Sequence, residues 1–197
     1  MEQLALHEKI FVDSEYLEED ENHSELSCSD CHKGNPEDPD WKTSHNGLVK
    51  DPSYLKDNVC LECHDIDSHN YENSLHYHTK PLVDIVLNRA GPSHSTQIAV
   101  KGAAENHCAK CHSSCGQCHV SRPDSADGGL LSAHEFLKRP PMKETCIACH
   151  GSRVGNEYLG ENKSCKPDVH YKKAFMTCEK CHTSRDARGW RRLLKPL

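Results

Sequence analysis

The sequence predicts a fold of coil and short α-helices with almost no β-sheet. The chain has 197 residues, yet only 35% are hydrophobic, the mean hydropathy is −0.80, and there are only three Phe and two Trp. A soluble chain of this length ordinarily buries a large apolar core, which this composition cannot supply. A short motif, Cys-x-x-Cys-His, also recurs along the whole length. We therefore expect an organising element other than an apolar core.

The motif occurs six times, whereas random placement of 13 Cys and 16 His would give roughly 0.07 copies. Cys-x-x-Cys-His is the attachment signature of haem c, in which two thiols bond to the vinyl groups and the histidine binds iron. We therefore expect six haems c. The predicted thioether cysteines are Cys28, Cys31, Cys60, Cys63, Cys108, Cys111, Cys115, Cys118, Cys146, Cys149, Cys178 and Cys181. The predicted proximal iron ligands are His32, His64, His112, His119, His150 and His182.

The main alternative to haem is zinc. Paired Cys-x-x-Cys motifs build zinc sites of four cysteines, or of two cysteines and two histidines. Zinc gives no reason for a histidine directly after the second cysteine in every copy, so haem is the favoured interpretation. Cys165 is left over, and nothing near it in the sequence indicates a redox role.

With its six motifs, the chain resembles the multihaem (hexahaem) c-type cytochromes over residues 28–182, and the extracellular cytochrome filament, or nanowire, type in particular. The resemblance implies a polypeptide wrapped around a stacked haem chain, with electron transfer as its function. It also implies export, since covalent haem attachment takes place outside the cytoplasm. We therefore expect an extracellular or periplasmic protein. The first residues show neither a basic start nor an apolar run, so we expect that the signal peptide is absent from this chain.

The chain divides into three predicted parts. These are an acidic arm over 1–25, a hexahaem domain over 26–182 and a basic tail over 183–197. In the arm, the expected apolar anchors are Leu4, Leu6, Ile10 and Phe11. Pro81, helical spacing and the following Gly91-Pro92 predict a helix over 81–90, and further helices are expected over 102–112 and 170–183. Two residues alone separate the third motif from the fourth, so haems 3 and 4 should be neighbours.

The distal iron ligands must come from the ten histidines outside the motifs. Only three Met are present, so we expect bis-histidine, low-spin iron at low potential. Histidines in short turns or at helix starts are favoured, as in the cytochromes that this chain resembles, and these are His45, His76, His134 and His170. Further candidates are His23, His94 and His107. Surface positions are expected for His7, His69 and His78.

The charge distribution bears on partners. Residues 1–25 carry nine acids and one base, whereas residues 166–197 carry nine bases and three acids. These segments could be two solvated tails, or they could pair head to tail between copies and give an open polymer. In the second case, His7 or His23 could be donated to a haem of the neighbouring copy. The net charge of −6 argues against nucleic-acid binding, and no stretch is apolar enough to span a membrane.

Three functions remain open on the sequence. The favoured one is electron transfer in an extracellular filament, with self-association and with redox proteins or extracellular acceptors as partners. The second is a soluble periplasmic multihaem electron carrier. The third is a reductase of nitrogen or sulfur oxyanions, which needs a haem with an open iron position. Nitrite reductase-type enzymes mark that haem with lysine in place of the motif histidine, and all six motifs here keep histidine, so we expect no enzyme.

Overall fold

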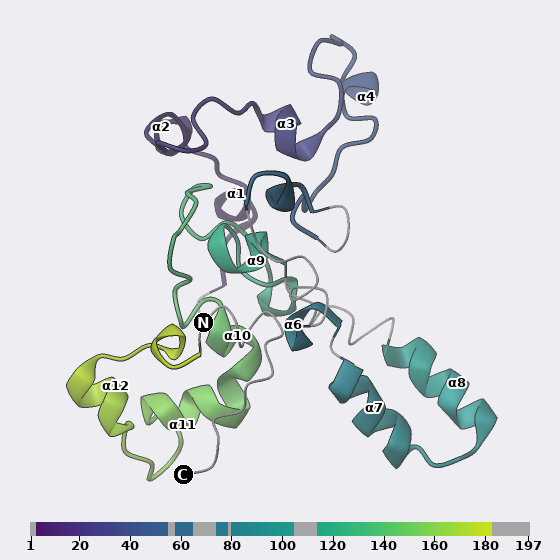
Figure 1. The fold of residues 1–197 in the computed structure, drawn as a ribbon, viewed down its shortest axis with the longest axis vertical. Helices are drawn as coiled ribbons and strands as arrows, with labels where there is room; N and C mark the ends of the chain where they lie inside the picture. The colour runs from purple at the N-terminus through teal and green to yellow at the C-terminus, as the bar shows by residue number, and fades with distance from the viewer. Residues whose placement is uncertain (1–2, 55–57, 65–73, 79, 105–113, 183–197) are drawn as a thin grey trace.

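The computed structural model describes residues 3–54, 58–64, 74–78, 80–104 and 114–182. Within these ranges the chain is built from short helices and coil (Figure 1), which confirms the predicted secondary-structure class. The β-structure described there is an isolated antiparallel bridge between Ser121 and Leu130. None of the helices in this part of the chain is long and apolar enough to cross a bilayer.

The two longest helices form a hairpin. They are α7 (Lys80–Arg89) and α8 (His94–Ala103), which pack against each other and project away from the rest of the chain (Figure 1). The other α-helices are α1 (Leu6–Lys9), α2 (Ser14–Glu18), α3 (Cys28–His32), α4 (Trp41–Ser44), α6 (Leu75–His78), α9 (Gly116–His119), α10 (Cys146–His150), α11 (Asn156–Leu159) and α12 (Val169–Ala174). Single 3-10 turns are η2 (Val59–Glu62), η5 (Asp124–Ala126) and η7 (Cys178–Lys180), and η6 (Gly151–Gly155) is a π-helix between α10 and α11.

One helix prediction is confirmed, and two have a wrong boundary. Helix α7 confirms the helix over 81–90, and Gly91, with φ of 82°, follows its end. The helix over 102–112 is wrong at its start, because α8 runs over His94–Ala103; residues 105–112 lie outside the described part. Packing along α7 stabilises α8, and the local pattern did not indicate this contact. The helix over 170–183 is also wrong, since α12 ends at Ala174, where Phe175 turns to a left-handed φ of 51°.

The polypeptide has a very small apolar core of its own. Among the described residues, the buried hydrophobic side chains are those of Met142 and Leu159. The expected anchors Leu6, Ile10 and Phe11 are instead 82%, 77% and 59% exposed, so that prediction is wrong for these three. The arm is attached by polar and backbone contacts, which hydrophobic patterning cannot reveal.

Those contacts join the arm to a loop of the same chain. The Lys9 ammonium lies 2.5 Å from the Asp127 carboxylate, and the hydrogen bond from Lys9 lowers the pKa of Asp127. Backbone N–H groups of Leu130 and Asp13 donate to the carbonyls of Lys9 and Ala133, both at 3.0 Å. Gly129 has φ of 95°, and a Cβ there would lie 3.1 Å from Lys9 Cγ. Residues 9–13 are therefore held against residues 127–133 in cis.

A polar cluster ties the segment before motif 2 to motif 4. The carboxylate of Asp51 accepts from the Ser53 hydroxyl (2.6 Å), the Ser114 hydroxyl (2.7 Å) and the Gln117 amide (3.3 Å). The Ser53 hydroxyl in turn accepts from the N–H of Gly116 at 2.7 Å. Ser53, Ser114 and Gln117 are all buried, so these bonds replace water and fix the two segments together.

We predict that Asp51→Ala destabilises the folded protein. Removal of the carboxylate leaves buried hydroxyl and amide donors without their acceptor, at a cost of about 1–3 kcal/mol for each unsatisfied group. Thermal unfolding of the purified protein, followed by circular dichroism, measures the effect. The matched control is Asp38→Ala, which removes one local bond from the N–H of Asp40. Equal melting temperatures for the two variants would contradict the clamping role of Asp51.

Candidate functional site

Each described Cys-x-x-Cys-His motif is a single helical turn. Motifs 1 and 5 are helices α3 and α10 in full. In motifs 2, 4 and 6, the N–H of the histidine donates to the carbonyl of the first cysteine, at 2.9, 3.0 and 2.8 Å. Residues i, i+3 and i+4 of such a turn lie on one side. Both thiols and the imidazole therefore leave the backbone in the same direction. Motif 3, Cys108–His112, lies outside the described residues.

Polar caps position these turns. At motif 1, Ser27 and Asp30 form a capping box, in which hydrogen bonds from Ser27 lower the pKa of Asp30. At motif 2, the side-chain Oδ1 of Asn58 accepts from the N–H of Cys60 at 3.0 Å, while its Nδ2 lies 3.3 Å from the sulfur of Cys115. Asn58 is 5% exposed, so this one side chain links motif 2 to motif 4.

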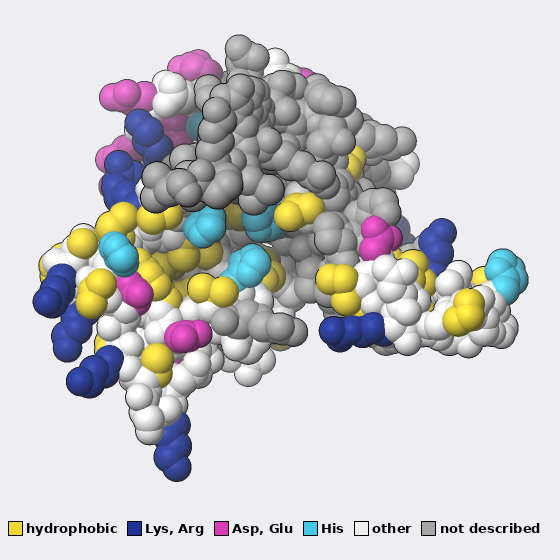
Figure 2. Space-filling view, turned by 60° about the horizontal axis from the view of Figure 1, so that its bottom comes forward, with side chains coloured by type: hydrophobic (Ala, Val, Ile, Leu, Met, Phe, Trp, Pro, Cys, Tyr) yellow, Lys and Arg dark blue, Asp and Glu magenta, His cyan; other side chains and the backbone are white. Residues whose placement is uncertain are grey.

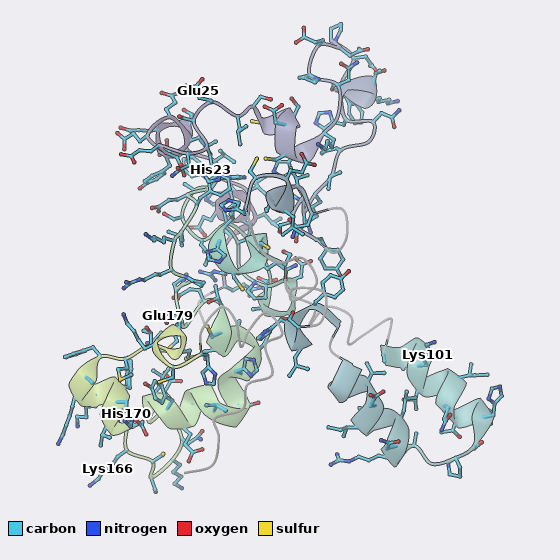
Figure 3. The ribbon with its side chains drawn as sticks, in the orientation of Figure 1. His23, Glu25, Lys101, Lys166, His170 and Glu179 are labelled. Atoms are coloured by element: carbon cyan, nitrogen blue, oxygen red, sulfur yellow. The ribbon has the colours of Figure 1, made fainter. Side chains whose placement is uncertain are left out.

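The structure brings three motif histidines close to three histidines outside the motifs. Ring centres are 6.1 Å apart in each of the pairs His32–His134, His64–His23 and His150–His76. His23 lies near the upper part of the molecule in Figure 3. The interplanar angles differ, at 68° for the first pair, 30° for the second and 83° for the third. Each pair joins segments that are far apart in the sequence.

The common separation is one at which two imidazoles can share a metal ion. Two metal–nitrogen bonds of about 2.0–2.1 Å, with the distance from each nitrogen to its ring centre, put two imidazole centres about 6.3 Å apart. Directly stacked rings lie closer, as His23 does on Phe136 at 4.1 Å. The three pairs therefore fit an iron atom held between two imidazoles.

Hydrogen bonds at the other ring nitrogen also fit metal ligation. Nδ1 of His32 lies 2.7 Å from the carbonyl oxygen of Val49, and Nδ1 of His119 lies 2.6 Å from that of Leu137. A metal-binding histidine usually donates its second N–H to such a carbonyl, which fixes the tautomer and leaves Nε2 for the metal. These two proximal candidates are held in that state by the backbone.

The electrostatics of two pair members favour a neutral imidazole. Burial, and secondarily the neighbouring His32, lowers the pKa of His134, whose buried Nδ1 has no hydrogen-bond partner in the described part of the chain. Desolvation, followed by His76 and His182, lowers the pKa of His150. A neutral imidazole is the form that binds a metal.

Three distal candidates have an oriented ring nitrogen. Nδ1 of His23 lies 3.1 Å from Asp20, that of His45 2.7 Å from the Trp41 carbonyl, and that of His170 2.9 Å from Asp168. The Asp168 carboxylate accepts hydrogen bonds from the backbone and the side chain of His170, and these bonds lower its pKa. His170 is exposed, and it lies on α12 (Figure 3).

The remaining candidates are placed as follows. The three ring pairs do not include His45, His94 or His170, and His94 is exposed at the start of α8. His7 is exposed. His69 and His107, like motif 3, lie outside the described residues, as does the side chain of His78. Figure 2 shows histidine side chains among hydrophobic ones on one face beside the projecting hairpin, with Lys and Arg at its edge.

Cysteines of different motifs lie near one another. Hydrogen bonding to Cys115, together with burial, raises the pKa of Cys60. Burial and Cys146 raise the pKa of Cys178 to about 11. Burial also raises the pKa of Cys31, with a smaller contribution from Cys63.

No protein-family model, curated protein or solved structure matches this chain.

Among the described residues, no three or more His, Cys, Asp or Glu side chains gather into a metal-binding group. Cys165 belongs to none of the motifs, and its sulfur lies 3.6 Å from the Lys166 carbonyl and 3.7 Å from the Glu157 carbonyl.

Sequence reasoning missed three residues that organise the site: Asp51, Asn58 and Phe136. The first two clamp motif 2 to motif 4, and Phe136 lies against two of the paired histidines. The sequence offers only a weak signal for two of them, which is their nearness to site residues. Asn58 stands two residues before Cys60, and Phe136 stands two residues after His134. Only the folded arrangement distinguishes them from ordinary loop residues.

Proposed function

We propose that this chain transfers electrons through six covalently attached, bis-histidine haems c, as a subunit of an extracellular filament. The observation that carries the proposal is the set of three histidine pairs, each joining a motif histidine to a non-motif histidine at 6.1 Å. Bound haem supplies the one-electron couple of iron, and the protein supplies attachment, ligation and spacing.

Different residues provide haem attachment and iron ligation. The thiols of each motif anchor one haem, and the turn aims the following histidine at its iron. Numbered by motif, haem 1 is ligated by His32 and His134, haem 2 by His64 and His23, and haem 5 by His150 and His76. His45, His94, His107 and His170 are left as distal candidates for the other three.

The cysteine contacts support an order of neighbours. The hydrogen bond between Cys60 and Cys115 supports haems 2 and 4 as neighbours, and that between Cys146 and Cys178 supports haems 5 and 6 as neighbours. Together with the short spacing between motifs 3 and 4, these contacts favour one group of neighbouring haems made of haems 2, 4 and 3, and a second made of haems 5 and 6. Closely spaced haems favour electron transfer over catalysis, which needs an iron with an open position.

The small apolar core supports the same proposal. A chain whose described part buries two hydrophobic side chains cannot offset its backbone entropy by burial alone. Porphyrin faces would provide the missing apolar surface, and thioether bonds would tie the coil around them.

Charge placement favours polymerisation over the soluble periplasmic carrier. The acidic segment around α2 and the lysines around α12 lie toward opposite ends of the long axis, as Glu25 and Lys166 show in Figure 3. Opposite charges at opposite ends favour head-to-tail contacts, which extend into open polymers unless a ring closes. The cis contact between His23 and His64 leaves His7 as the candidate for donation to a neighbouring subunit.

Haem content tests the cofactor. We predict that the exported protein has the mass of its chain plus six haems, and that its ferric form shows only low-spin signals in electron paramagnetic resonance. Two thioether bonds at each motif and two histidines at each iron require this result. Expression without a haem-attachment system is the control. Zinc in place of haem, or a high-spin ferric signal with nitrite turnover, would reject the proposal.

Separate substitutions test the ligand pairs. We predict that His134→Ala, His76→Ala and His23→Ala each convert one haem to a high-spin or altered form even in unassembled protein, because each loses a distal ligand. His134→Met should raise the potential of one haem by on the order of 0.1 V, since Met ligation raises the potentials of haems. His69→Ala is the control and should stay low-spin, because the sequence predicts no ligand role for His69. Six unchanged low-spin signals in His134→Ala would reject the pairing.

Imaging tests the filament. We predict long, thin fibres in negative-stain electron microscopy of the wild-type protein, and short or absent fibres in Lys172→Glu/Lys173→Glu, because α12 then repels the acidic end of the next copy. A compensating Glu18→Lys/Glu19→Lys change in the same chain should restore fibres. Single particles from wild-type protein would favour the periplasmic carrier instead.

A further inference from the structure

A four-residue segment, 134–137, contacts three of the histidine sites described above. His134 is itself paired with His32. The ring of Phe136 lies between His134, at 5.4 Å and 70°, and His23, at 4.1 Å and 16°. The Leu137 carbonyl accepts from Nδ1 of His119 at 2.6 Å, and its N–H donates to the His119 carbonyl at 2.8 Å.

Phe136 has a different setting from the other two phenylalanines of the chain. Phe11 is 59% exposed and Phe175 is 82% exposed, whereas Phe136 is half-buried. The aromatic neighbours recorded for Phe136 are two imidazoles, and the buried hydrophobic side chains of the described chain are Met142 and Leu159. The ring is therefore placed by histidines rather than by an apolar core.

The two contacts constrain the histidines differently. The nearly parallel stack fixes the plane of the His23 ring, and the edge-on contact fixes the plane of the His134 ring. The backbone adds to the second constraint, because Ala133 and His134 both have positive φ, at 43° and 80°. Groups that surround a ligand set its orientation, and orientation tunes the metal that it binds.

We propose that Phe136 is a positioning residue shared by two haem sites, and that it sets the imidazole planes of the distal ligands of haems 1 and 2 together. This inference rests on the proposed function, since it assigns His134 and His23 to those irons. One aromatic side chain thus couples the ligand geometry of two neighbouring redox centres without binding either iron.

Phe136→Leu in the haem-loaded protein tests the proposal, with Phe175→Leu as the matched control. Low-spin ferric signals in electron paramagnetic resonance report the angle between the two axial imidazoles. The signals of haems 1 and 2 are those altered by His134→Ala and by His23→Ala. We expect Phe136→Leu to shift the g values of both signals, and Phe175→Leu to shift neither.

A shift of one signal or of none in Phe136→Leu, or the same shifts in Phe175→Leu, would overturn the proposal. Wild-type protein with selectively labelled Phe rings provides a measurement that no folding defect can obscure. In its reduced, diamagnetic form, nuclear Overhauser contacts from one Phe ring to two haem-ligating imidazoles support the proposal, and contacts to fewer than two reject it.

Haem content and spin state of the wild-type protein are measured first. A wild-type protein without six low-spin haems rejects the proposed function itself. With six low-spin haems established, an unchanged Phe136→Leu spectrum rejects only the role of Phe136.

Discussion

The chain must obtain tertiary order without an apolar core of ordinary size, and the rest of its structure depends on that constraint. Where a globular protein would pack leucines, the described residues use polar clamps: the Asp51 carboxylate with its three donors, Asn58 between two motifs, and Lys9 on Asp127. Such bonds specify geometry but contribute little net stability each. Six covalent porphyrins would supply the apolar surface that these clamps arrange.

The motif turn connects this constraint to the chemistry. One helical turn presents two thiols and an imidazole on the same side, so each motif needs no support from a long helix or a sheet. Short capped turns joined by coil are sufficient, and the described part of the chain consists largely of them. In the proposed holo-protein, the haems and not the helices are the units that pack.

Sequence reasoning predicted the features that local chemistry decides. The coil-and-helix class follows from composition, and helix α7 follows from the spacing of its residues before Gly91. It failed where tertiary contacts decide. Helix α8 begins at His94 because it packs on α7, and α12 stops where Phe175 adopts a left-handed conformation. The histidines could be counted from the sequence but not paired, because each pair joins distant segments that no local pattern relates.

The pairing has a consequence for how the protein is made. His32 precedes its partner His134 by more than half of the chain. During synthesis and export, the first motif would receive its haem long before the segment carrying His134 emerges. On this pairing, the site nearest the N-terminus would wait longest between its first and its second ligand. Until then its iron would be open to small molecules, and a truncated or stalled chain would carry a reactive haem that the finished protein does not.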